Sequence, residues 1–99
     1  MDIELLYVPD CPHRRLARDH LDLALSSMRL PAVIREREVR SSEEADRLGM
    51  RGSPTFLIDG KDPFADPPEP AGLSCRLYRG ETGLSGAPTV SQLVDALGS

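Results

Sequence analysis

Four segments of the chain have a pattern typical of β-strands, which is either an alternation of apolar and polar residues or a short unbroken apolar run. Residues 3–8 (IELLYV) are apolar nearly throughout, which is typical of a strand buried on both faces. Residues 32–39 alternate in their second half, which indicates a strand with one solvated face at or near a sheet edge. Residues 55–59 (TFLID) predict a third strand, and residues 74–79 (SCRLYR) predict a fourth.

The segment after the first strand has the three- and four-residue spacing of an amphipathic helix. We expect this helix to run from Cys11 to about Arg29, because Pro12 suits the first helical turn and Pro31 stops the pattern. The apolar face of this helix comprises Ala17, Leu21, Ala24, Leu25 and Met28.

Two further helices are indicated by their caps. Ser41 and Glu44 have the spacing of a capping box, and Gly49 is a suitable C-cap for the short helix that they start. Near the C-terminus, Thr89 is a candidate N-cap for a second amphipathic helix. The apolar face of that last helix comprises Val90, Leu93, Val94 and Leu97.

These elements follow one another in the order β-α-β-α-β-β-α, which predicts a single α/β domain over residues 1–99. The first β-α-β unit requires a right-handed crossover between parallel strands. The last two strands are expected to pair antiparallel across residues 61–73, a Pro-rich segment without periodicity that we predict to be a surface loop. The expected architecture is a four-stranded mixed sheet with helices on both faces.

Composition and charge exclude several classes of protein. The 99 residues are 39 % hydrophobic and 28 % charged, with a formal net charge of −4, which is an ordinary globular mixture. Arginines are interleaved with acids, as in IREREV, and this argues against a nucleic-acid partner. No apolar run approaches the roughly 18 residues that cross a membrane, and the acidic N-terminus lacks the pattern of a signal peptide. We therefore expect a cytoplasmic protein with neither a nucleic acid nor a membrane as its partner.

The stretch YVPDCPHRRLA, residues 7–17, holds the residues with the most evident chemistry. It places Cys11 at the junction of the first strand and the first helix, followed by His13 and Arg14. The free N–H groups of a helix start and two nearby cations favour the thiolate, which is the nucleophilic form of cysteine, whereas Asp10 opposes it. Either Cys11 is a reactive thiol or it is a small residue at a helix start, and the sequence leaves both readings open.

The order of elements and two motifs resemble the thioredoxin-like fold family. GMRGSPTFLIDG, residues 49–60, is similar to the stretch in which that family begins a strand with a cis-proline facing the active-site cysteine, and this proline would be Pro54. CPHR resembles the CPHC motif of disulfide oxidoreductases, except that Arg14 stands where the resolving cysteine would be. The resemblance covers roughly residues 2–60 and 74–98, and it implies a monothiol variant of the motif.

The resemblance implies thiol–disulfide or related redox chemistry at Cys11, with no cofactor and no dedicated metal site. His13 would either act as a proton donor to a leaving thiolate or be an exposed helix residue that only shifts the local potential. Arg14 would bind a carboxylate or oxyanion of the substrate. The partner would be a small thiol such as glutathione, or a peptide or protein thiol.

The resemblance also implies which residues bind the substrate. In that family the backbone before the cis-proline pairs with an extended substrate, so Ser53 would offer its N–H and C=O groups beside Pro54. Pro12, next to the cysteine, completes the predicted binding residues.

Two other functions stay open at this stage. One is a non-catalytic thioredoxin-like module that binds a peptide or an anion at the same groove. The other is thiolate chemistry on a soft metal, because PTFLIDGKDPF and SCRLY are similar to stretches in chains described as organomercurial lyase-like.

The second cysteine, Cys75, is expected to be a core or sheet residue. If residues 75–79 pair antiparallel with residues 55–59, Cys75 lies opposite Asp59, roughly 13 Å from Pro54 at the rise of a β-strand. A disulfide requires Cα atoms within about 7 Å, so this register predicts that Cys75 does not resolve Cys11. His20 is expected to be a packing or surface residue, and Phe64 to be either a lid or a plug of the Pro-rich loop.

Overall fold

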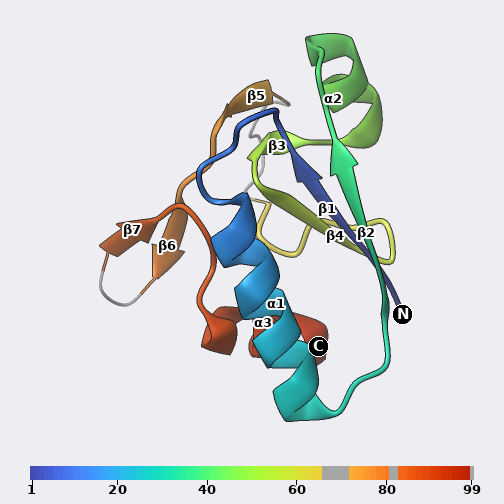
Figure 1. The fold of residues 1–99 in the computed structure, drawn as a ribbon, viewed down its shortest axis with the longest axis vertical. Coiled ribbons are helices and arrows are strands. Elements are labelled where there is room, and N and C mark those ends of the chain that lie inside the picture. The colour runs from blue at the N-terminus through green and yellow to red at the C-terminus, as the bar shows by residue number, and fades with distance from the viewer. Residues whose placement is uncertain (66–71, 81–82, 99) are drawn as a thin grey trace.

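The first three predicted strands form one mixed sheet with β1 in its centre (Figure 1). The computed structural model describes residues 1–65, 72–80 and 83–98. Strand β1 (Asp2–Tyr7) pairs in parallel with β2 (Val33–Glu38) and antiparallel with β4 (Thr55–Ile58). Strand β2 is at the edge of this sheet, as its alternating pattern predicts, and its ends lie within one residue of the predicted bounds.

Helices cover both faces of the β1 strand, because its side chains alternate between two apolar cores. Ile3 and Leu5 pack with α1 (Arg14–Met28) and α3 (Val90–Gly98), whereas Leu6 packs with α2 (Ser42–Leu48). The larger core comprises the buried residues Ile3, Leu5, Ala17, Leu21, Ala24, Leu25, Phe56, Tyr78, Ala87, Leu93 and Leu97. The predicted apolar faces of both long helices thus lie in this core.

The fourth predicted strand does not join the central sheet, so the expectation of one four-stranded sheet is wrong. Residues 74–79 contribute to two separate strands. Strand β5 (Gly72–Cys75) pairs in parallel with β3 (Arg51–Ser53), a short strand that the hydrophobic pattern did not indicate. Strand β6 (Tyr78–Gly80) forms a hairpin with β7 (Gly83–Ser85).

A glycine without a side chain lets β5 approach β3 closely. Gly52 has a φ of +104°, and a Cβ atom at this position would lie 2.9 Å from both the Cβ of Arg76 and the carbonyl oxygen of Ser74. Next to this contact, the Arg76 N–H donates to the Ser53 carbonyl over 3.0 Å. The parallel pairing of β3 with β5 therefore depends on the missing side chain at Gly52 more than on the hydrophobic pattern of either strand.

This pairing also overturns the predicted position of Cys75. In the backbone register, Cys75 is opposite Ser53 and not opposite Asp59. The estimate of roughly 13 Å from Pro54 rested on antiparallel pairing at strand rise and no longer holds. The side chain of Cys75 and residues 66–71 of the predicted loop at 61–73 lie outside the described residues.

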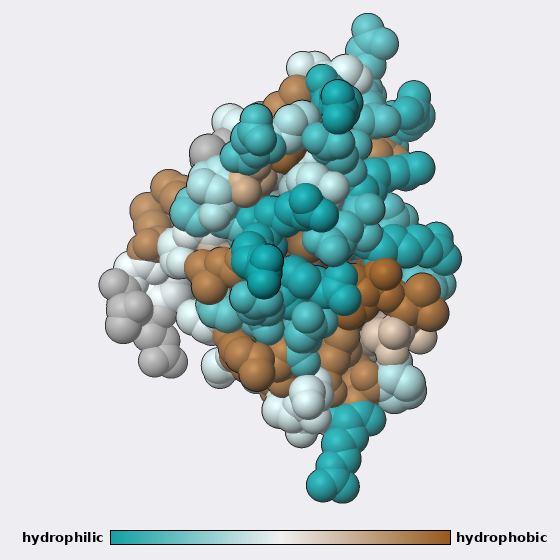
Figure 2. All heavy atoms as spheres, viewed as in Figure 1, coloured by the Kyte–Doolittle hydropathy of each residue, from teal (hydrophilic) through white to brown (hydrophobic). Residues whose placement is uncertain are grey.

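The face of the molecule that carries α1 and β2 is mainly hydrophilic (Figure 2). Arginines and glutamates on β2 pair with charges on β1 and α1; for example, Glu36 accepts from both Arg14 and Arg18. The charged run that begins in β2 is thus a solvated surface, as expected. Among the described residues, no helix is long and apolar enough to cross a membrane.

Candidate functional site

The loop between β1 and α1 places Cys11 before the helix and not inside its first turn. Asp10 has a left-handed backbone, with a φ of 60°, and the Cys11 N–H donates to the Val8 carbonyl over 3.2 Å. The helix begins only at Arg14, with His13 at the N-cap. The prediction of a helix from Cys11 is therefore wrong by three residues, because a separate turn precedes the helix.

The Cys11 thiol is free and partly exposed, and it lies at a groove of about 610 Å³. The remaining lining residues come from one side of α1 and from β2: Arg14, Arg15, Arg18, Asp19, Asp22 and Glu36. Three cations and three carboxylates surround the groove, so which cation is available to a ligand depends on how these charges pair.

Arg14, the cation that the sequence favoured, is already engaged. Its Nε atom lies 3.1 Å from Glu36 Oε1, and its guanidinium stacks 4.0 Å above the Tyr7 ring. The hydrogen bond to Glu36 raises the pKa of the Arg14 guanidinium above its ordinary value. Arg14 therefore supports the wall of the groove, and a substrate anion would have to compete with Glu36 for it.

Arg15 is the available cation, and sequence reasoning missed it. It is exposed, lines the same groove and has no ion-pair partner among the described residues. Arg14 and Arg15 are equivalent in the sequence, because only the position of β2 decides which of them meets Glu36. A sequence-level signal could have come only from placing the edge strand beside the helix.

His13 is held in place by a glycine from the other end of the chain. A Cβ atom at Gly86 would lie 2.3 Å from carbon atoms of the His13 ring, so the ring packs directly on the Gly86 backbone. His20 Nδ1–H donates to the Pro88 carbonyl over 2.8 Å, which fixes α1 to the same segment. His20 is thus a packing residue, as expected. His13 is two residues from Cys11 in the chain, and its contact with Gly86 fixes the position of its ring.

Ser53 and Pro54 are joined by a cis peptide bond, as predicted, but both residues are buried. The Ser53 hydroxyl accepts a hydrogen bond from the Val8 N–H over 3.1 Å, and the Ser53 carbonyl accepts one from Arg76. The Tyr78 hydroxyl donates to the Pro54 carbonyl over 2.5 Å. The Ser53 carbonyl, which we expected to pair with a substrate, thus already accepts a hydrogen bond from the residue directly after β5, and a role of Ser53 in substrate binding stays a prediction.

These contacts still connect the two motifs that the sequence singled out. Val8 binds Ser53 through its N–H and Cys11 through its carbonyl, so one residue links the cysteine loop to the start of β4. Pro12, between Cys11 and His13, is exposed. Ser53 positions the loop through Val8, and neither Ser53 nor Pro54 lines the groove.

The described part of the chain holds no group of three or more histidine, cysteine or acidic side chains that could bind a metal ion.

No family model matches the chain, and neither the curated proteins nor the solved structures compared with it contain a match.

Proposed function

We propose that this protein is a thioredoxin-like protein that carries out thiol–disulfide exchange through a single thiol, Cys11, with a small thiol such as glutathione as its partner. The observation that carries the proposal is that the partly exposed Cys11 lines the same groove as Arg15, which has no ion-pair partner within the described residues. A thiol that can meet a solute and a nearby cation are the two features that such exchange needs.

The arrangement of the elements supports the thioredoxin-like part of the proposal. Strands β1 and β2 are parallel and joined through α1, β4 is antiparallel to β1, and a cis-proline precedes β4. The cysteine follows the central strand β1 and precedes the helix of the first β-α-β unit. The separate β3–β5 and β6–β7 pairs are departures from the four-stranded sheet expected of that fold.

The proposed exchange has two steps and needs no other oxidant. The Cys11 thiolate attacks the glutathione sulfur of a mixed disulfide, forms a Cys11–glutathione disulfide and releases the substrate as a thiolate. A second glutathione thiolate then attacks the glutathione sulfur on Cys11, releases the Cys11 thiolate and leaves as glutathione disulfide. His13 protonates the departing thiolate, and Arg15 binds a carboxylate of glutathione.

The test is reduction of a glutathionylated peptide by glutathione, followed by mass spectrometry. We expect the wild-type protein and the Cys75→Ser variant to accelerate release of the peptide thiol, and Cys11→Ser to return the rate to that without protein. A wild-type rate equal to the uncatalysed rate would overturn the proposal. Loss of activity in Cys75→Ser would contradict a single-thiol mechanism.

The same samples separate the two other functions. A module that binds a peptide through the Ser53 backbone is disfavoured, because the Ser53 carbonyl already accepts a hydrogen bond from the Arg76 N–H. Soft-metal chemistry would instead appear as stoichiometric Hg²⁺ binding that both Cys11→Ser and Cys75→Ser abolish.

A further inference from the structure

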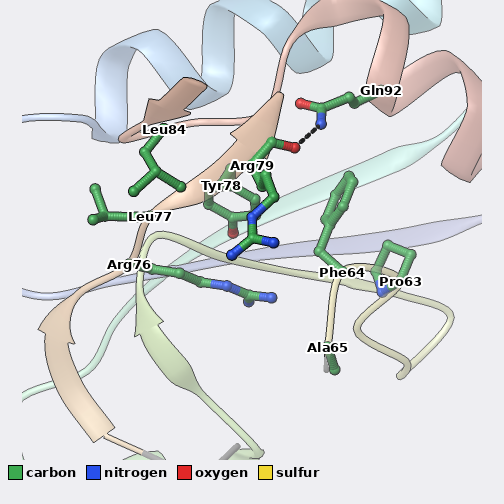
Figure 3. A pocket seen from close by; sticks show the side chains of 9 residues that line it. All are labelled: Pro63, Phe64, Ala65, Arg76, Leu77, Tyr78, Arg79, Leu84 and Gln92. Carbon is green, nitrogen blue, oxygen red and sulfur yellow. Dashed lines mark hydrogen bonds between the residues drawn. The ribbon is translucent and has the colours of Figure 1, made fainter. Parts of the chain in front are cut away.

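A second cavity, of about 300 Å³, lies between the segment after β4 and the C-terminal hairpin. Among the residues that the structure describes, it shares no lining residue with the Cys11 groove. Figure 3 shows its walls: Pro63, Phe64 and Ala65 on one side, and Arg76, Leu77, Tyr78, Arg79, Leu84 and Gln92 on the other. Its volume is at the lower end of the roughly 300–1,000 Å³ range of ligand pockets, which limits an occupant to a small molecule.

Two arginines face this cavity, and they differ in their pairing. Arg76 is buried, and its guanidinium binds both carboxylate oxygens of Asp62, at 2.6 and 3.3 Å. Arg79 is exposed and has no ion-pair partner among the residues that the structure describes. The Arg79 side chain is directed towards the space between Arg76 and Phe64 (Figure 3).

The Arg79 backbone is fixed, which holds its side chain at the mouth of the cavity. The Gln92 amide donates to the Arg79 carbonyl over 2.6 Å, and its oxygen accepts from the Thr89 N–H over 2.8 Å. Gln92 thus uses both of its polar atoms within the protein. Asp62 pairs with Arg76, so among the described residues that line the cavity one positive charge, that of Arg79, is left without a carboxylate partner.

Apolar side chains also line the cavity, beside the two arginines and Gln92. The Phe64 and Tyr78 rings meet edge to face with centroids 5.3 Å apart, and Phe56 packs against both. Leu77 and Leu84 are 59 % and 62 % exposed. An apolar ligand body would remove part of this leucine surface from water.

We propose that this cavity binds a small organic acid, with its carboxylate on Arg79 and its apolar body against Phe64, Leu77 and Leu84. The planar guanidinium matches the two oxygens of a carboxylate, and one unbalanced charge matches a singly charged anion. This site is independent of the thiol chemistry at Cys11.

The test is titration calorimetry of the full chain with 3-phenylpropionate, with the uncharged 3-phenylpropionamide as the matched ligand. We expect saturable binding of one carboxylate per chain, and binding of the amide roughly tenfold or more weaker, because the amide forms no charge-assisted pair with Arg79. Arg79→Gln is expected to weaken carboxylate binding by a similar factor, and Arg79→Lys by less. Arg47→Gln removes one exposed charge from α2 and is the control for net charge.

Three results would overturn the proposal. They are no binding of 3-phenylpropionate by the wild-type protein, equal binding of acid and amide, and equal binding by Arg79→Gln and Arg47→Gln. Far-UV circular dichroism verifies that both variants are folded, which is expected because both side chains are exposed.

Discussion

The residues around Cys11 differ in whether their polar groups already form hydrogen bonds or ion pairs within the protein. Arg14 is paired with Glu36, whereas Arg15 lines the same groove without an ion-pair partner in the described part of the chain. Ser53 uses its hydroxyl on Val8 and its carbonyl on Arg76. Residue types alone therefore indicate a candidate site, but hydrogen bonds and ion pairs decide which of its polar groups are still available.

The Gly86–His13 contact gives a prediction at this scale. Gly86→Ala would place a methyl group 2.3 Å from the His13 ring, so the ring or the backbone has to move. We expect a loss of about 1–3 kcal/mol of unfolding free energy, as for other overpacked sites, measured by urea denaturation. Gly72→Ala is the control, because a Cβ atom there meets nothing within 4 Å. Equal stability of the two variants would show that Gly86 does not hold His13.

At the scale of elements, the local signals in the sequence predicted the helices well. The Ser41 hydroxyl accepts from the Glu44 N–H over 3.1 Å, and Gly49 ends α2 with a φ of 76°, as the capping box and the C-cap predict. Thr89 caps α3 by accepting from the Gln92 N–H over 3.1 Å. Caps can be predicted because both partners lie within four residues of each other.

Strand pairing at the C-terminal side could not be predicted in the same way. The partner of residues 74–79 lies across the Pro-rich segment, so no hairpin turn fixes the register. The deciding feature is the space at Gly52, which is visible only once β3 and β5 are side by side. The same reason explains the wrong position of Cys75 and the missed strand β3.

Gly52 therefore supports a prediction about an element. Gly52→Ala would meet Arg76 and Ser74 at 2.9 Å and separate β5 from β3. We expect faster hydrogen exchange at the Arg76 amide, and a loss of unfolding free energy of about 2–4 kcal/mol from steric overlap and strain at positive φ. Gly60→Ala is a matched control, because Gly60 also has a positive φ but open space around its Cα. The same loss in both variants would mean that backbone strain alone is responsible, and that the β3–β5 contact contributes nothing.

At the scale of the whole molecule, a buried ion pair joins the C-terminal part to the central sheet. The Arg76 and Asp62 side chains are 4 % and 5 % exposed, and Arg76 also donates to Thr55 at the start of β4. This pair connects the segments before and after residues 66–71. It was invisible in the sequence, because Arg76 appeared there as one polar position of a predicted strand.

Removing one member of the pair is expected to be far more harmful than removing both. Arg76→Met leaves the buried Asp62 carboxylate without its partner, for a loss of about 3–5 kcal/mol in urea denaturation. The double variant Arg76→Met/Asp62→Leu is expected to recover most of that loss, because no buried charge remains. A double variant as unstable as the single one would show that shape, and not charge, accounts for the stability of this region.

The α/β class, the parallel pairing of β1 with β2 and the place of Cys11 after β1 could be predicted from the sequence. The reason is that buried strands and helix caps leave periodic or local patterns. The identity of the available arginine and the contact of Gly86 with His13 could not, because each depends on segments that are distant in the chain.

The central claim is that Cys11 is a reactive thiol, and its alkylation rate tests this most directly. We would measure the reaction of iodoacetamide with the folded Cys75→Ser variant at pH 7 by intact mass, beside N-acetylcysteine as the free thiol. If Cys11 is the reactive thiol of the proposed exchange, we expect a rate roughly fivefold or more above that of the free thiol. A rate equal to or below that of N-acetylcysteine would contradict the account and leave Cys11 as a structural residue between β1 and α1.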